Sequence, residues 1–114
     1  MRFYKIKEHD EVIFSNNEIK SDLEEIEASY DEDNSHQIKL KELGNLVNIT
    51  VNDGLHSMNE THYIKFVVVE TNFGFKVRNL NVGDKIALDF VLLRNEELKN
   101  IYLYCNVHSL IKFK

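Results

Sequence analysis

The histidines and the single cysteine are the residues of this sequence best suited to chemistry. Four of the five histidines lie in the part of the chain rich in strand patterns: His36, His56, His62 and His108. The only cysteine, Cys105, precedes His108 by three residues. Imidazoles and thiolates are common ligands of transition metals. We therefore predict that these five side chains form a metal site.

Each candidate stands where a predicted strand begins or ends beside a loop. A strand that ends at Cys105 and then turns tightly would aim its sulfur and the His108 imidazole at one point. His56 and His62 flank a loop, so both rings can turn toward a common centre. Sites on β scaffolds are usually built at such boundaries. The alternative is an interaction module in which the histidines are incidental and the cysteine is a small buried hydrophobe.

The composition of the ligand set favours iron. Structural zinc takes four ligands, usually with more sulfur than this chain offers. Blue copper uses two histidines, one cysteine and a weak axial methionine, whereas the only internal methionine here, Met58, adjoins His56 and not the last histidine. One thiolate among imidazoles suits iron, because the thiolate donates electron density through the metal to the opposite ligand. Five ligands would leave the sixth octahedral position open to a small molecule. A copper electron-transfer protein stays as an alternative.

Short β-strands are the elements that must position these residues. Apolar residues alternate with period two in six runs: 36–40, 47–51, 62–69, 73–77, 86–92 and 101–105. Their β-branched and aromatic side chains suit a pleated, half-buried surface. Turn sequences such as Asn52-Asp53-Gly54 separate them. The runs predict an all-β fold of about seven strands, an antiparallel sandwich or barrel.

The first third of the chain differs from the rest. We expect residues 3–7 and 12–15 to form a hairpin, residues 22–28 to form one or two helical turns capped by Ser21, and the acidic residues 30–35 to form a linker. His9 is expected to be an exposed turn residue. The predicted organisation is therefore an N-terminal segment, 1–33, followed by a β-sandwich, 34–114.

Charge and composition exclude several classes of partner. Residues 1–33 hold 4 Lys or Arg and 11 Asp or Glu, whereas residues 34–114 hold 10 and 8, so no dense basic stripe for nucleic acid exists. No apolar stretch is long enough to span a bilayer, and no secretory signal pattern is visible. One cysteine excludes an internal disulfide. We therefore expect a cytoplasmic protein that binds neither nucleic acid nor membrane.

Two segments resemble motifs of the superoxide reductases, the family of desulfoferrodoxin and neelaredoxin. His56-Ser57-Met58 followed by Thr61-His62-Tyr63-Ile64 is similar to the family's His-Pro-Met and His-(Tyr/Trp)-Ile element. Tyr104-Cys105-Asn106-Val107-His108-Ser109 is similar to its Tyr-Cys-Asn-Leu-His-Gly element. His36 falls where the family places its first ligand. The resemblance covers roughly residues 36–112, and the joint pattern is more specific than either motif.

The resemblance implies a fold, a cofactor and a reaction. The fold would be an immunoglobulin-like antiparallel β-sandwich, with a short N-terminal hairpin or extension, that carries one mononuclear non-haem iron, Fe(2+)/Fe(3+), per chain. The implied ligands are His36, His56, His62 and His108 in a plane, with the Cys105 thiolate axial. In the family, superoxide binds opposite the thiolate, is reduced by one electron and leaves as hydrogen peroxide, and rubredoxin typically re-reduces the iron. The implied oxidoreductase would serve superoxide detoxification and electron transport as a homo-oligomer, a dimer or tetramer.

The chain also departs from the family's pattern. Family members usually carry Glu-Lys before the first ligand, and here Asn34 and Ser35 occupy those positions. The lysine attracts anionic superoxide, so its loss predicts slower capture; Lys39 or Lys41 is a possible substitute. Residues 3–9 faintly resemble the start of the family's rubredoxin-like domain without its cysteines, so we expect no second iron centre. A non-catalytic iron or redox protein on the same scaffold is therefore the main functional alternative.

Overall fold

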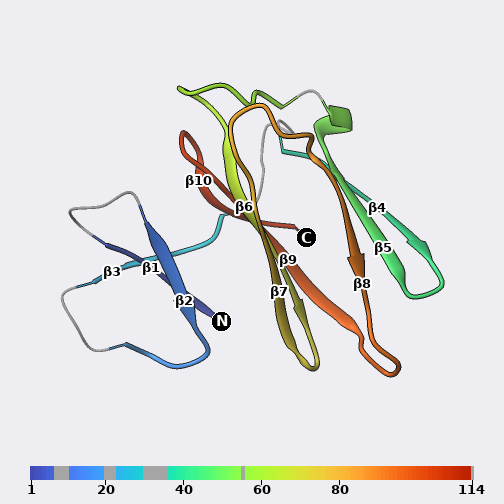
Figure 1. Ribbon diagram of the computed structural model, residues 1–114. Helices are drawn as coiled ribbons and strands as arrows, with labels where there is room; N and C mark the ends of the chain where they lie inside the picture. Colours follow the sequence, from blue (N-terminus) through green and yellow to red (C-terminus); the bar gives the residue numbers. More distant parts are fainter. Residues whose placement is uncertain (7–10, 20–22, 30–35, 55, 114) are drawn as a thin grey trace.

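The computed structural model of the chain is built almost entirely of β-strands (Figure 1). It describes residues 1–6, 11–19, 23–29, 36–54 and 56–113. Within these ranges the only helical element is one short 3-10 turn, η1 (Asn52–Gly54). No helix of the described residues has the length and apolar character needed to cross a membrane.

The strands form three antiparallel sheets. The N-terminal sheet has the order β2-β1-β3 and consists of β1 (Arg2–Lys5), β2 (Val12–Ser15) and β3 (Glu24–Ile26). A four-stranded sheet has the order β10-β9-β6-β7 and consists of β6 (Ile64–Thr71), β7 (Gly74–Asn79), β9 (Leu98–Cys105) and β10 (Ser109–Lys112). A second three-stranded sheet has the order β4-β5-β8 and consists of β4 (Ile38–Leu43), β5 (Leu46–Val51) and β8 (Ala87–Val91). The last two sheets are the seven-stranded sandwich that the sequence predicts.

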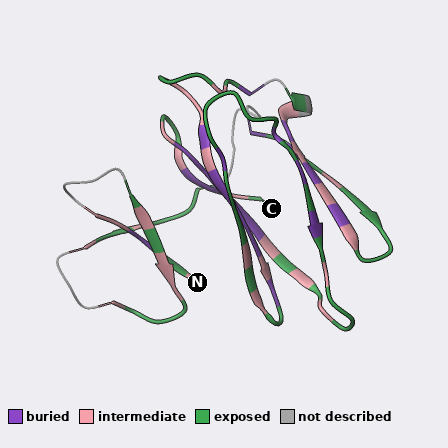
Figure 2. Ribbon diagram, in the orientation of Figure 1, coloured by how far each residue is buried: buried purple, intermediate pink, exposed green. Residues whose placement is uncertain are grey.

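The core of the sandwich follows from the alternation of apolar residues. On β9, Ile101, Leu103 and Cys105 belong to the core between the two sheets, and all are at most 2% exposed. Their neighbours Tyr102 and Tyr104 belong to a second apolar cluster, because successive side chains of a strand point to opposite faces. Buried residues therefore run along the whole length of β6 and the second half of β9 (Figure 2).

The N-terminal sheet covers the outer face of the four-stranded sheet. Phe3 of β1 is 2% exposed, and its ring lies 5.0 Å from that of Tyr102. The other buried members of this second cluster are Phe66, Val68, Tyr104 and Leu110. Beyond β3 the chain joins the free edge of β10, where Ser29 accepts a hydrogen bond from Lys112 N–H and donates one to the Leu110 carbonyl. The described residues thus form three layers of sheet.

The N-terminal third corrects one expectation and confirms another. The hairpin is present, with Phe3 opposite Phe14 and Lys5 opposite Val12. The helical turns expected over residues 22–28 are wrong, because Glu24–Ile26 form β3 and Ile26 pairs with Phe3. A helix of one or two turns is only marginally stable on its own. The conformation of this segment is therefore decided by its packing on an apolar cluster. His9, the expected linker 30–35 and the proposed boundary at residue 33 lie outside the described residues.

Strand pairing brings the predicted site residues to one end of the sandwich. Ile64, at the start of β6, pairs with Cys105 at the end of β9. Ile38, at the start of β4, pairs with Val51 at the end of β5. His36 therefore precedes β4 at the same end where the loop before β6 and the turn after β9 are found (Figure 1).

Candidate metal centre

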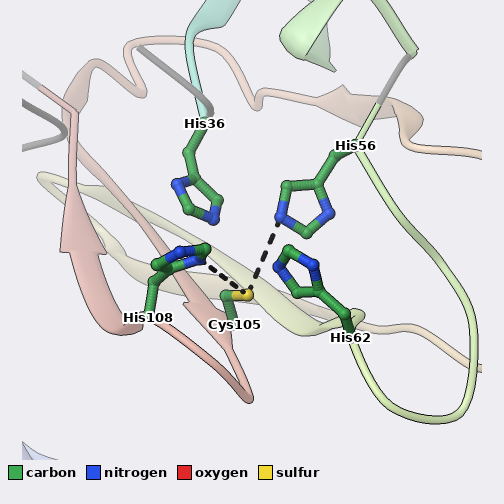
Figure 3. A group of neighbouring side chains, drawn as sticks. All are labelled: His36, His56, His62, Cys105 and His108. Atoms are coloured by element: carbon green, nitrogen blue, oxygen red, sulfur yellow. Dashed lines mark hydrogen bonds between the residues drawn. The ribbon is translucent and has the colours of Figure 1, made fainter. Parts of the chain in front are cut away.

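Five side chains from three separate segments converge at this end of the molecule (Figure 3). The potential ligand atoms of His36, His56, His62, Cys105 and His108 all lie within 4.8 Å of one another. His36 precedes β4, His56 and His62 flank the loop before β6, and Cys105 and His108 flank the turn between β9 and β10. The structure therefore brings together every residue that the sequence singles out for the site.

The four imidazoles are arranged as a ring, with the sulfur near its axis. Ring centroids are 4.6 Å apart for His36 and His56, 4.7 Å for His56 and His62, 5.1 Å for His62 and His108, and 4.7 Å for His108 and His36. His56 and His108 are therefore opposite members of the ring. The Cys105 sulfur is 3.7 Å from Nε2 of His56 and 3.6 Å from Nδ1 of His108. The sulfur is therefore nearly equidistant from two imidazoles on opposite sides of the ring.

The orientation of His56 is fixed by its neighbour in the chain. Its Nδ1 lies 2.7 Å from the Ser57 carbonyl oxygen, which can only accept a hydrogen bond. Nδ1 must therefore carry the proton, and Nε2 is left with its lone pair facing the centre. A backbone carbonyl that holds the outer nitrogen of an imidazole in this way is typical of metal-ligating histidines.

The loop between His56 and His62 is held by polar contacts within itself. Oδ1 of Asn59 accepts hydrogen bonds from the Thr61 and His62 backbone N–H groups at 3.1 and 2.9 Å, and from the Thr61 hydroxyl at 2.8 Å. The sulfur of Met58 accepts a hydrogen bond from Ile64 N–H at 3.4 Å. Met58 is thus engaged by the start of β6, which does not favour its use as the axial ligand of a copper site.

The β9–β10 turn is tied to the His62 segment by Asn106. Its amide oxygen accepts a hydrogen bond from Tyr63 N–H at 2.8 Å, and its amide nitrogen donates one to the Thr61 carbonyl at 3.1 Å. Its backbone N–H donates to the Tyr63 carbonyl at 3.2 Å. The first N–H group after Cys105 is therefore used by the neighbouring segment rather than by the sulfur.

The site is buried on the side of the core and open on the side of the turn. Cys105 is fully buried and His36 and His56 are buried, whereas His62 is half-buried and His108 is exposed. Burial lowers the pKa of His56 below its ordinary value; the hydrogen bond to Ser57 opposes this effect, and the three other imidazoles add to it. The neutral imidazole favoured by this shift is the form that binds a metal.

The donor set fits a metal ion. Nε2 of His62 is buried inside the group and makes no hydrogen bond to any described residue. A buried polar atom without a partner is costly, and an ion at the centre of the group would satisfy it. Four imidazoles and one thiol exceed the two histidines of a blue-copper site and are poorer in sulfur than most structural zinc sites. This group is placed for a metal.

The sequence also singles out charged and polar positions next to His36. Residues 30–35, which include Asn34 and Ser35, are outside the described ranges. Lys39 and Lys41 are exposed on β4, where the inward positions are occupied by Ile38 and Leu40. Asn59 and Asn106 organise the site but were not anticipated as doing so. Their position in the sequence could have indicated this role, since Asn59 lies between His56 and His62 and Asn106 lies between Cys105 and His108.

Comparison with known proteins gives a clear result for the fold. No protein-family model matches the sequence, and no curated protein matches it. Among solved structures, a superoxide reductase from Treponema pallidum matches with a TM-score of 0.80 and 21% sequence identity, over 99% of this chain and 96% of that one. Superoxide reductase (1Fe-SOR) from Giardia intestinalis matches with a TM-score of 0.57 and 22% identity, over 69% and 94% of the two chains. A superoxide reductase (neelaredoxin) from Ignicoccus hospitalis matches with a TM-score of 0.54 and 19% identity, over 70% and 77%.

These matches show that the chain has the β-sandwich fold of superoxide reductases. The Treponema match covers nearly the whole chain, so it extends over the N-terminal sheet. The other two cover about the length of the sandwich.

Proposed function

We propose that this chain is an oxidoreductase of the superoxide reductase type. It would reduce superoxide by one electron to hydrogen peroxide at one mononuclear non-haem iron held by His36, His56, His62, His108 and Cys105. The observation that carries this proposal is the convergence of four imidazoles and one thiol within 4.8 Å, in the fold of solved superoxide reductases.

The chain's own residues supply the conditions for this reaction. The bound ferrous ion would provide the electron, and two protons are taken up for each hydrogen peroxide released. The four imidazoles would hold the ion, and the Ser57 carbonyl keeps the lone pair of His56 Nε2 facing the centre. The buried Cys105 would hold it as a thiolate and supply electron density to it. His108 is exposed, so solvent reaches this edge of the site and can deliver protons.

The proposal also names an electron donor, a cellular compartment and an oligomeric state. A rubredoxin-like protein would re-reduce the iron, because the sequence has one cysteine and therefore no further thiolates for a second iron centre of its own. We place the reaction in the cytoplasm and expect a homo-oligomer, since the free edges of short sheets invite strand pairing.

The test is metal analysis and spectroscopy of protein purified without oxygen. We expect one iron per chain, a red-region absorption band in the ferric form, and rapid oxidation of the ferrous form by superoxide generated by pulse radiolysis. Cys105→Ser should remove the band, whereas Met58→Leu, which changes the other sulfur near the site, should keep it. Stoichiometric copper, or no metal at all, would contradict the proposal.

A non-catalytic iron protein is the second candidate, and the absence of the family's Glu-Lys pair favours it. Asn34 and Ser35 carry no charge to attract superoxide. Iron content with a normal band, but no reaction of the ferrous form with superoxide, would identify this alternative.

Charge steering gives a further test of the catalytic proposal. Ser35→Lys should speed the capture of superoxide and make its rate fall as salt is added, because a positive charge next to His36 in the sequence attracts the anion and ions screen it. Ser15→Lys, on the N-terminal sheet, is the control with the same change in net charge and should leave the rate unchanged. An unchanged rate in Ser35→Lys would refute the steering argument.

A further inference from the structure

Asn106 differs from the ligands around it because it reaches across two segments of chain. It directly follows Cys105, and its three hydrogen bonds all go to residues 61–63, which surround His62. Both polar atoms of its side chain are used, at 2.8 and 3.1 Å. Asn59, the other polar organiser, contacts only its own loop.

We infer that Asn106 is a positioning residue that sets the place of His62 relative to the Cys105 sulfur. This inference rests on the proposed metal site and deepens it. Cys105 is held by strand pairing and by the core, so its position does not depend on Asn106. His62 lies in an isolated bridge with Asn59, outside the regular strand that begins at Ile64. The side chain of Asn106 therefore supplies two of the three hydrogen bonds by which the residue after β9 holds the segment that carries His62.

The geometry of the pairing explains why this link is needed. The register between β6 and β9 shifts between Ile64 and Phe66, so the regular ladder is interrupted just before the His62 segment. Such an irregularity disrupts the ladder locally, and beyond it a single pair remains, Ile64 with Cys105, so the β6–β9 ladder ends before Tyr63 and His62. Asn106 replaces ladder hydrogen bonds at this point by presenting an acceptor to Tyr63 N–H and a donor to the Thr61 carbonyl.

The experiment compares variants of the full chain loaded with ferrous iron. Asn106→Ala and Asn106→Leu remove both side-chain hydrogen bonds, and the leucine keeps nearly the same volume. Asn100→Ala is the matched control, because Asn100 lies on the same strand and donates to Glu70 at 2.8 Å, away from the site. The readouts are the rate of iron loss to a chelator and the position of the ferric thiolate band.

We expect both Asn106 variants to lose iron at least about tenfold faster than wild type and to shift the band, because His62 is held less firmly in position. Asn100→Ala should change neither. Wild-type release and an unshifted band in the Asn106 variants would overturn the inference, as would an equal effect of Asn100→Ala. A wild-type chain that binds no iron would instead overturn the proposed function, and the two failures are therefore distinguishable.

Discussion

At the scale of single residues, the site depends on a few backbone contacts next to the ligands. The Ser57 carbonyl determines which nitrogen of His56 faces the centre, and Ser109 lets the chain reverse directly after His108. Ser109 has a φ of +65°, in the left-handed region that favours glycine. The resembling family has glycine at this place in its motif. Here the turn keeps a β-carbon at some cost in stability.

The first prediction concerns this turn. Ser109→Gly should raise the free energy of unfolding of the metal-free protein by roughly 0.5–1 kcal/mol, since relief of the strained φ outweighs the extra freedom of glycine in the unfolded chain. Urea denaturation measures the change. Ser15→Gly, within β2, should instead destabilise. A loss of stability in Ser109→Gly would show that its side chain contributes more than its backbone costs.

The sequence predicted which residues would meet but not what holds them. Histidine and cysteine are rare and chemically distinctive, so their positions at strand ends pointed to one site. The roles of Asn59 and Asn106 depend on contacts across a loop and between distant segments, such as Asn106 with Tyr63. Asparagine is common in turns, so its type alone does not reveal such a contact.

At the scale of elements, strand alternation predicted the sandwich well and the short edge pieces poorly. Every run expected between residues 36 and 105 corresponds to a strand, with ends shifted by a few residues. β10 has only four residues and is defined by its pairing with β9, while the acidic composition of β3 favours a helix locally. Both β3 and β10 become strands by pairing with a neighbour, and the periodicity of a single segment does not reveal such a pairing.

The loop between β8 and β9 is fastened to the four-stranded sheet through Glu96. This residue lies between β8 and β9, and its side chain is 4% exposed. It accepts hydrogen bonds from the Thr71 hydroxyl at 2.6 Å and Leu93 N–H at 2.9 Å, and Lys76 lies 3.3 Å away. These contacts, the Thr71 hydrogen bond foremost, hold the pKa of Glu96 below its ordinary value of 4.5.

This shift predicts a loss of stability in acid. A carboxylate whose pKa is lowered by folding stabilises the fold above its unfolded pKa, and this contribution disappears as pH falls through the folded pKa. Glu96→Gln should therefore lower the melting temperature near neutral pH, and the gap to wild type should close below about pH 4.5. Thermal unfolding across this range measures it, with the exposed Glu97→Gln as control. A gap independent of pH would contradict the prediction.

At the scale of the whole molecule, the four-stranded sheet is the middle layer of three and packs against a sheet on each of its faces. Its inner face carries Cys105 and the sandwich core, and its outer face carries the aromatic residues covered by the N-terminal sheet. Phe66 and Tyr104 stack there with an interplanar angle of 5° and centroids 5.5 Å apart. The N-terminal sheet therefore supports β9, the strand that ends at Cys105.

This arrangement predicts that the N-terminal sheet contributes substantially to stability. Phe3→Ala should lower the free energy of unfolding by roughly 3–5 kcal/mol, because it leaves a cavity against Tyr102 in a buried cluster. Urea denaturation of the full chain checks the loss. Phe73→Ala, at a side chain 56% exposed, should change stability far less. Equal effects of the two substitutions would show that the third layer adds little.

The pairing of Ile64 with Cys105 also has a consequence for the time course of refolding. Its two strands are separated in sequence by all of β7 and β8, so they meet only after a long loop has closed. Folds dominated by such distant pairings refold in roughly milliseconds to seconds. Cys105 meets the His62 segment only when these strands pair, so in the proposed iron form the absorption band should appear at the rate at which the sandwich closes after dilution from denaturant.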